Sequence, residues 1–256
     1  MRIRPIHVVA ILLLLVTCLI PLHERIKSAT VSAFQTLKGR KSVSDRAAQF
    51  SAAVQSRLAA RFQEIAVAYP PKKIILVGLK QERTLEVWVA NESGGFQYLK
   101  SYPILAASGR LGPKLAEGDR QVPEGLYKIE SLNPNSLFHL ALRVDYPNAF
   151  DRAKGTLDGR TDLGSDIMIH GKAASVGCLA MGNPAAEVLF VLAAEAGIGN
   201  VQVILSPIDF RLRELPSSMP SVPAWTPELY AQIQKELMRL KRQEAAELHA
   251  VPRPRQ

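Results

Sequence analysis

The sequence predicts a mainly β fold of the α+β class, a sandwich or barrel with a few packed helices and a helical extension at each end. Between residues 73 and 206, short apolar segments alternate with turns that contain glycine or proline, which is typical of a mainly antiparallel sheet. On both sides of this region, apolar residues recur every three or four positions, which is the helical period. The chain has 256 residues, 47% of them hydrophobic, and can therefore bury one substantial core and carry extra segments around it.

Residues 1–23 have the features of a signal anchor or a signal peptide. A short basic start precedes an apolar run over residues 8–22. A small-residue cleavage pattern does not follow the run directly, and the nearest one is at residues 31–33, so we favour an uncleaved anchor. A lipid-modified Cys18 is a weaker alternative, because the residue before it is bulkier than in most lipoprotein signals; otherwise Cys18 is an apolar filler.

The formal net charge of +9 and the isoelectric point near 9.7 favour anionic surroundings. Nucleic acid, an anionic membrane surface and a cell-wall polymer all fit this charge. Aromatic residues make up only 6% of the chain, and they are not interleaved with dense runs of Lys and Arg. We therefore predict no nucleic-acid partner.

Residues 24–72 are predicted to form a linker and an amphipathic helix. The first part is polar and basic, which is typical of a linker. The helix is expected over residues 44–68, with Ser42 or Ser44 as its N-cap, and the Tyr-Pro-Pro sequence at residues 69–71 ends it. We expect this helix to pack on the main domain or on another protein as a spacer.

Residues 73–206 are predicted to form the main domain. Strands are expected at residues 74–77, 84–89, 96–104, 138–144, 166–170 and 201–205, with a further turn and strand within residues 122–129. A helix is expected from Ala185 to Ala196, with Asn183 as its N-cap, Pro184 at its first position and Gly197 at its end.

Residues 207–256 are predicted to form a proline-rich linker and a charged helix. The helix is expected over residues 228–248, where four apolar residues lie on one stripe. Those residues are Leu229, Ile233, Leu237 and Leu240. The stripe predicts that this helix docks on the body of the protein or on a partner.

A histidine and a cysteine stand at the two ends of a segment rich in Gly, Ala and Ser. His170 ends the strand predicted at residues 166–170, and Gly171 allows the turn that brings Cys178 back beside it. A neighbouring imidazole removes the proton of a thiol, and the resulting thiolate attacks carbonyl groups. Gly177 frees the backbone before the cysteine, where amide N–H groups can face a developing oxyanion. The pair predicts a cysteine nucleophile with a histidine base.

Other interpretations of this pair stay open. Two ligands without a second Cys or His pair fall short of a zinc site, so we predict no metal and no cofactor. Inert buried cysteines and histidines are common. An oxidising compartment normally pairs its cysteines, whereas the other cysteine of this chain, Cys18, lies in the predicted membrane segment. An unpaired Cys178 therefore indicates reactivity, either catalytic or as a redox or regulatory thiol.

The same residues resemble the signature of the L,D-transpeptidase catalytic domain family (YkuD type), cysteine enzymes that act on cell-wall peptides. The matching stretches are Ile169-His170-Gly171 and Ser175-x-Gly177-Cys178, and residues 121–127 resemble the turn that precedes a strand in the family. The resemblance covers about residues 73–206, which it implies to be an L,D-transpeptidase-like catalytic domain.

The resemblance also implies the roles of the site residues. Cys178 would be the nucleophile and His170 the general base. The carbonyl of Gly171 would orient the imidazole, and the amides near Gly177 and Cys178 would form the oxyanion hole. Ser175 would position the loop by hydrogen bonding to its backbone.

Two residues depart from the pattern of many family members. Val176 and Ala180 stand where those members have histidine and arginine. This pattern is similar to the branch typified by YafK, as are the stretches at residues 108–114, 146–153 and 164–170. That branch is associated with hydrolysis that detaches a lipoprotein from diaminopimelate in peptidoglycan.

Without that arginine, other cations are needed to hold the carboxylates of an acidic substrate. Lys114 and Arg152 are the first candidates, because they lie in stretches shared with the branch. Further candidates are Arg143, Arg160 and Lys172.

The resemblance thus implies a periplasmic enzyme, anchored in the inner membrane, that transfers acyl groups of peptidoglycan stem peptides through a thioester at diaminopimelate. One alternative is a hydrolase or amidase of the same branch that cleaves the link between peptidoglycan and a lipoprotein. An alternative of a different class is a catalytically inactive scaffold that binds peptidoglycan.

Overall fold

A computed structural model describes residues 39–216, 218 and 220–240. The chain divides into two compact units at Lys41 and Ser42, and all helices and strands described here belong to the second. The predicted signal segment with Cys18, most of the linker after it and the last part of the predicted C-terminal helix lie outside the described residues. Of the helices that are described, none is long and apolar enough to span a membrane.

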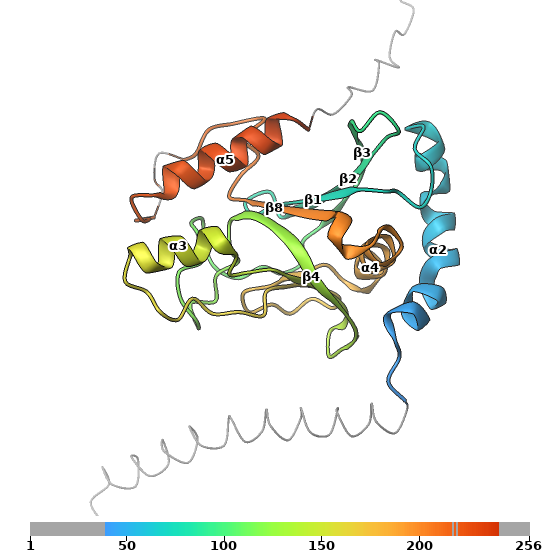
Figure 1. The fold of residues 1–256 in the computed structure, drawn as a ribbon, viewed down its shortest axis with the longest axis horizontal. Coiled ribbons are helices and arrows are strands. Elements are labelled where there is room, and N and C mark those ends of the chain that lie inside the picture. Colours follow the sequence, from blue (N-terminus) through green and yellow to red (C-terminus); the bar gives the residue numbers. More distant parts are fainter. Residues whose placement is uncertain (1–38, 217, 219, 241–256) are drawn as a thin grey trace, which may run out of the picture. The chain divides into compact units, whose positions relative to one another are not determined.

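The centre of the fold is one curled, mixed sheet of eight strands (Figure 1). The strands are β1 (Ile74–Leu79), β2 (Thr84–Ala90), β3 (Phe96–Pro103), β4 (Gly125–Ser136), β5 (His139–Val144), β6 (Met168–His170), β7 (Leu179–Ala180) and β8 (Val201–Ser206). Their order in the sheet is β3-β2-β1-β8-β4-β5-β6-β7. The pairs β1–β8 and β6–β7 are parallel, and the other neighbours in this sheet are antiparallel.

Strand β4 makes the sheet curl. Its first part, Gly125–Lys128, pairs with β8, and the part from Ile129 onward pairs with β5, with irregular register between Ile129 and Ser131. At the far edge, Ala180 of β7 forms a bridge with Ala106, which follows β3. Strand β7, at one edge of the sheet, thereby contacts the segment that follows β3, the strand at the other edge. These features confirm the predicted α+β fold class.

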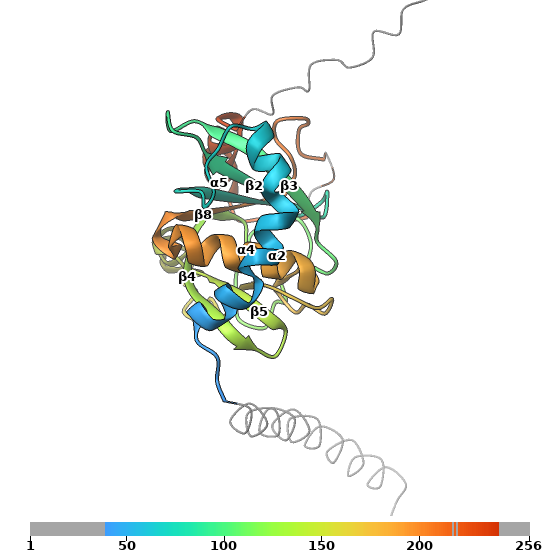
Figure 2. The same cartoon turned by 90° about the vertical axis from the view of Figure 1, so that its right-hand side faces the viewer.

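Helices α2 (Val43–Glu64) and α4 (Asn183–Ala196) pack against each other on one side of the sheet (Figures 1 and 2). The N-cap of α2 is Ser42, whose hydroxyl accepts a hydrogen bond from the backbone N–H of Asp45 (3.0 Å). The predicted helix over residues 44–68 is confirmed, although it ends at Glu64, because Ala66 adopts a positive φ. The helix buries Val54, Leu58 and Phe62.

One expectation about the helices was wrong, and one helix was not predicted. The N-cap of α4 is Gly182 rather than Asn183, whose side-chain oxygen instead accepts a hydrogen bond from the backbone N–H of Lys172 (2.9 Å). A helix that the sequence analysis missed, α3 (Ala149–Leu157), begins at the N-cap Asn148. Its capping box with Asp151 was a readable signal, but only a few apolar residues follow it.

Helix α5 (Thr226–Met238) covers the opposite side of the sheet. Side chains alternate along a strand, so Ile75 and Val77 of β1 face α5, while Ile74 and Leu76 face the core with α2 and α4. The predicted apolar stripe is confirmed on this helix for Leu229, Ile233 and Leu237, which are all buried. The helix expected over residues 228–248 ends at Met238, and Leu240, which follows it, is also buried. The short 3-10 helix η1 (Ile198–Asn200) leads from α4 into β8.

A buried polar cluster ties α5 to the loop before β4. The hydroxyl of Tyr230 donates to Oε2 of Glu124 (2.7 Å), and Oε1 of Glu124 lies 2.8 Å from the ammonium of Lys80. The same carboxylate accepts a hydrogen bond from the backbone N–H of Gly112 (2.9 Å). The carboxylate thus depends on several donors in place of water.

We predict that Tyr230→Phe lowers the free energy of unfolding by about 1.5–3 kcal/mol, because a buried carboxylate loses a hydrogen-bond donor. Urea denaturation of the full chain measures this loss. The matched control is Tyr102→Phe, since the Tyr102 hydroxyl has no hydrogen bond within the described part of the chain. Equal losses in the two variants would contradict a specific role of the Tyr230 bond.

Candidate active site

The pairing of β6 with β7 brings His170 and Cys178 to one face of the sheet. His170 is the last residue of β6, and Cys178 comes directly before β7. The parallel register places Ile169 opposite Leu179 and His170 opposite Ala180. Ile169 and Leu179 point into the core, so the residues next to them, His170 and Cys178, point to the other face.

The imidazole of His170 is buried and held by the backbone. Its Nδ1 lies 2.6 Å from the carbonyl oxygen of Gly171. A carbonyl oxygen accepts hydrogen bonds only, so Nδ1 carries the proton and Nε2 is left as the basic nitrogen. Burial lowers the pKa of His170, and the hydrogen bond to Gly171 opposes this only in part. The contact expected between the Gly171 carbonyl and the imidazole is therefore present, on a neutral ring.

The thiol of Cys178 is half-buried and hydrogen-bonds to the carbonyl oxygen of Asp166 (3.6 Å) in place of the imidazole. Burial raises the pKa of this thiol above its usual range. A hydrogen bond from the Met168 backbone and the charge of Lys114 lower the pKa, whereas the carboxylate of Asp166 raises it. Burial thus favours a neutral thiol and a neutral imidazole at rest.

Serine hydroxyls occupy the backbone amides that were expected to form the oxyanion hole. The N–H of Cys178 donates to Oγ of Ser175 (3.1 Å), and this hydroxyl donates to the carbonyl of Cys178 (2.6 Å). The N–H of Gly177 donates to Oγ of Ser108 (2.6 Å). Gly177 has a φ of 86°, a conformation that favours glycine. Ser175 therefore contacts the loop backbone as expected, but an oxyanion would have to compete with both hydroxyls.

Ser108 is a site residue that sequence reasoning missed. Its hydroxyl donates to the carbonyl of Arg120 (2.7 Å) while it accepts from Gly177. The loop that carries Ser108 is held by the side chain of Gln121, which bonds to both the N–H and the carbonyl of Arg110. Ser108 opens the stretch at residues 108–114 that resembles the family branch, and this was the available signal.

The cations predicted to bind substrate are already engaged. The ammonium of Lys114 is buried and lies 2.6 Å from Oδ1 of Asp119. Arg152 lies on α3 and donates to the carbonyl of Pro147. The further candidates have partners as well: Arg143 pairs with Glu130 and Asp166, Arg160 pairs with Asp158, and Lys172 donates to the carbonyl of Leu137.

Two arginines near the candidate catalytic loop (residues 171–178) have no such partner. Arg110 and Arg120 belong to the loop that carries Ser108, and both are exposed. Their guanidinium groups make no hydrogen bond or ion pair with any other described residue. The backbone of Arg120 lies close to Gly177, since a Cβ placed on Gly177 would be 3.9 Å from the carbonyl carbon of Arg120.

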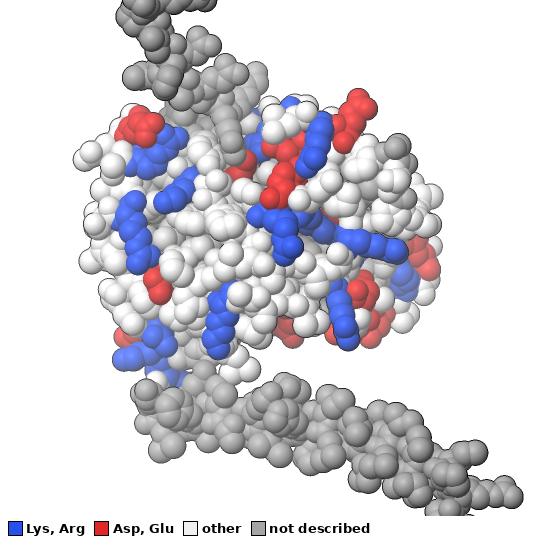
Figure 3. Space-filling model, turned by 180° about the vertical axis from the view of Figure 1, so that it is seen from behind, with Lys and Arg blue, Asp and Glu red and all other residues white. Residues whose placement is uncertain are grey.

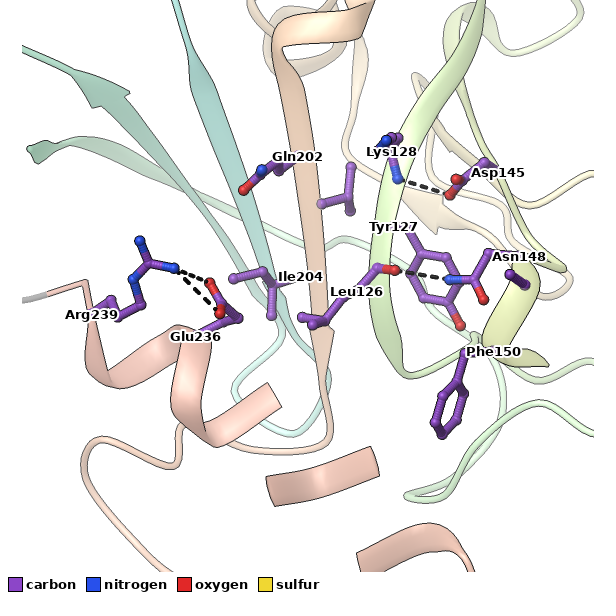
Figure 4. Close-up of a pocket in the computed structure, with 12 residues that line it drawn as sticks. Leu126, Tyr127, Lys128, Asp145, Asn148, Phe150, Gln202, Ile204, Glu236 and Arg239 are labelled. Carbon is purple, nitrogen blue, oxygen red and sulfur yellow. Dashed lines mark hydrogen bonds and ion pairs between the residues drawn. The ribbon is translucent and has the colours of Figure 1, made fainter. Parts of the chain in front are cut away.

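Other parts of the surface offer less chemistry. A hollow of about 560 Å³ lies between β4, β8 and α5, and neither His170 nor Cys178 lines it (Figure 4). Its polar groups bond to one another, such as Asn148 to the carbonyl of Leu126 (2.9 Å). On the face shown in Figure 3, Lys and Arg are dispersed among Asp and Glu instead of forming a continuous basic stripe. No cluster of three metal-binding side chains occurs among the described residues.

We predict that Asp166→Asn speeds the reaction of Cys178 with iodoacetamide roughly twofold to fivefold at pH 7, the size of effect expected for a partly exposed charge. Loss of the carboxylate lowers the pKa of the thiol and raises the thiolate fraction. Asn tolerates the positive φ at this position. The matched control is Glu130→Gln, which also removes a partner of Arg143. Mass spectrometry of the Cys178 peptide gives the rates, and an unchanged rate in Asp166→Asn would contradict the electrostatic account.

Comparisons with known proteins place this site in a family. The chain is 39% identical over 140 residues to YafK, a candidate L,D-transpeptidase of Escherichia coli (strain K12), and equally similar to YafK of strain O157:H7. Each alignment covers 53% of this chain and 53% of the relative, so the chain spans about half the length of the curated relatives it matches.

Two solved structures are also similar: Bd1075 of Bdellovibrio bacteriovorus (20% identity, TM-score 0.39) and the helical cell shape determining protein Pgp2 of Campylobacter jejuni (19% identity, TM-score 0.43). Each match covers 67% of this chain and 56% of the solved chain. The family model of the YkuD L,D-transpeptidase catalytic domain matches residues 72–203, which is just over half of the chain. The chain therefore belongs to the L,D-transpeptidase catalytic domain (YkuD) family.

Proposed function

We propose that the chain is a cysteine acyltransferase that acts on peptidoglycan stem peptides through a thioester on Cys178. Membership of the family supports an L,D-transpeptidase-type function on peptidoglycan. The observation that carries the proposal is the imidazole of His170, which shares one face of the β6–β7 pair with Cys178. Its Nδ1 is fixed at 2.6 Å from the Gly171 carbonyl, which leaves Nε2 as the base.

The proposed reaction has two steps. In the first, Nε2 of His170 takes the proton of the Cys178 thiol, and the sulfur attacks the carbonyl at the L-centre of diaminopimelate. The tetrahedral intermediate collapses, His170 gives the proton to the leaving amine, and a thioester remains. In the second, His170 takes a proton from an incoming amine or water, which attacks the thioester and releases the Cys178 thiol. Because burial keeps the resting pair neutral, proton transfer accompanies the attack on the substrate.

We propose that Arg110 and Arg120 hold the substrate's carboxylates. Ala180, at the position of the arginine in many family members, is fully buried in its bridge with Ala106. A guanidinium at this position would therefore have to leave the sheet. The two arginines of the neighbouring loop have exposed side chains without a partner among the described residues.

The second candidate reaction is hydrolysis of the link between peptidoglycan and a lipoprotein. The similarity to YafK and the replacement of the usual histidine by Val176, whose exposed fraction is 73%, favour it. The choice between amine and water depends on how well the pocket excludes water from the thioester.

One experiment separates the candidates. The full chain is incubated with sacculi, and the products are identified by mass spectrometry. New cross-links between diaminopimelate residues indicate transfer, whereas a freed lipoprotein peptide or free tetrapeptide ends indicate hydrolysis. Binding to sacculi without any product indicates an inactive scaffold, and reversible mixed disulfides on Cys178 without any product indicate a redox thiol.

We also propose that residues 1–23 anchor the protein in the inner membrane, with the family domain in the periplasm. The apolar run without an adjacent cleavage site supports this. Digestion of the domain by external protease in spheroplasts, with the protein in the membrane fraction, is the expected result. Protection of the domain until the cells are lysed would contradict the proposed location.

We predict that Cys178→Ala lowers product formation from sacculi at least about a thousandfold, because it removes the nucleophile. A half-buried Cys is replaced by a slightly smaller side chain, so the thermal unfolding midpoint should stay within a few degrees of the wild type. The control is Cys18→Ala, which removes the other cysteine and should keep full activity. Retained activity in Cys178→Ala would rule out the proposed mechanism.

A further inference from the structure

The tip of the β4–β5 hairpin, residues 136–139, lies against the imidazole of His170. The ring of Phe138 covers the imidazole, with 4.6 Å between the ring centroids and an angle of 37° between the ring planes. The centroid distance lies in the range in which two aromatic rings attract each other. Phe138 is exposed over 37% of its surface, and the ammonium of Lys172 lies 6.0 Å from the centroid of its ring.

Two hydrogen bonds hold the hairpin tip on the N-terminal side of the Phe138 ring. The backbone N–H of Phe138 donates to Oγ of Ser136 (3.0 Å). The ammonium of Lys172 donates to the carbonyl oxygen of Leu137 (2.6 Å). Because Lys172 belongs to the catalytic loop, this bond joins the hairpin to the segment that follows His170.

The residue after Phe138 is fixed as well. Nε2 of His139 lies 3.0 Å from Oε1 of Glu187 on α4, and the imidazole of His139 packs edge-on against Phe50 of α2. His139 has a φ of 77°, which is uncommon for a residue with a side chain and here is stabilised by these contacts. These contacts tie the hairpin tip to α2 and α4.

Gly171 allows this close approach. A Cβ at this position would lie 2.6 Å from the carbonyl oxygen of Phe138 and 2.7 Å from Oδ1 of Asn183. Real Cβ atoms do not come so close to other atoms, so any larger residue would push the hairpin away from the site. Gly171 therefore has two roles. Its carbonyl oxygen binds Nδ1 of His170, and its lack of a side chain lets the backbone of Phe138 come close.

We propose that Phe138 is a positioning residue for His170: its ring covers one face of the imidazole while the Gly171 carbonyl holds Nδ1, so that Nε2 stays on the side of Cys178. This inference deepens the proposed function, since it rests on His170 acting as the base. A ring held at one nitrogen only can still tilt, and a second contact on its face removes that freedom.

The ring of Phe138 also affects the pKa of His170. Burial is the main cause that lowers the pKa of His170, and Phe138 supplies part of that burial. The charged and titratable groups nearby are Cys178, Lys172 beside Phe138, and the pair of His139 with Glu187. None of them is a cause of the shift, so removal of the ring should raise the pKa of His170 by solvation alone.

The test compares Phe138→Ala and Phe138→Tyr with Leu137→Ala as the matched control. Leu137 is the neighbouring exposed apolar residue, and its side chain can be removed while its carbonyl keeps the bond to Lys172. We expect Phe138→Ala to lower kcat on sacculi about threefold to tenfold with little change in KM. Phe138→Tyr keeps an aromatic ring and should keep the wild-type kcat, and Leu137→Ala should also leave kcat unchanged.

The second readout does not depend on turnover. NMR titration of labelled histidines in the full chain gives the pKa of His170 in each variant. We expect an upward shift in Phe138→Ala and no shift in Phe138→Tyr or Leu137→Ala. If Phe138→Ala does not fold, Phe138→Leu removes the planar ring but keeps part of the apolar cover, and it should show an upward shift of the pKa that is smaller than expected for Ala, together with a loss of kcat.

An unchanged pKa and an unchanged kcat in a folded Phe138→Ala or Phe138→Leu variant would overturn the inference, as would an equal effect of Leu137→Ala. If the wild type forms no product from sacculi, the proposed function fails. The titration still decides in that case whether Phe138 controls the environment of the imidazole.

Discussion

The candidate site depends on the short parallel pairing of β6 with β7, in which Ile169 lies opposite Leu179 and His170 lies opposite Ala180. Parallel neighbours usually need a long crossover connection. Here the pair is so short that the chain has to travel back along the strand direction by only one residue, roughly 3.3 Å, and the short catalytic loop is sufficient. So short a pair needs support, and β5 on one side and the bridge from Ala180 to Ala106 on the other provide it.

Burial sets the protonation of the site. It raises the pKa of the thiol and lowers the pKa of the imidazole, so the neutral forms of Cys178 and His170 dominate at rest. A thiolate–imidazolium pair would react faster with any electrophile, including those that damage an exposed thiol. In the proposed mechanism the substrate completes the site, because its oxyanion must take the amides that Ser108 and Ser175 occupy.

The sequence predicted those parts of the site that are close together in the chain. Glycines and the apolar run before His170 indicated a strand, a turn and a return to Cys178, and the imidazole contact with Gly171 involves adjacent residues. Ser108 and Phe138 could not be found in this way, because they reach the catalytic loop from segments far away in the sequence. Their contacts depend on the curl of the sheet. For the same reason, Lys114 and Arg152 were chosen from their place in a motif, and only the fold revealed that both already have partners.

In the proposed mechanism, Cys178 forms the acyl-enzyme with help from His170. To detect it, the full chain is mixed with a tetrapeptide-containing muropeptide and quenched with acid within seconds, and the added mass is located by mass spectrometry. We expect an adduct of the acyl donor on the Cys178 peptide in the wild type, and none in His170→Ala on the same time scale. Product formation with an adduct on another residue, or an adduct that forms equally fast without His170, would contradict this mechanism.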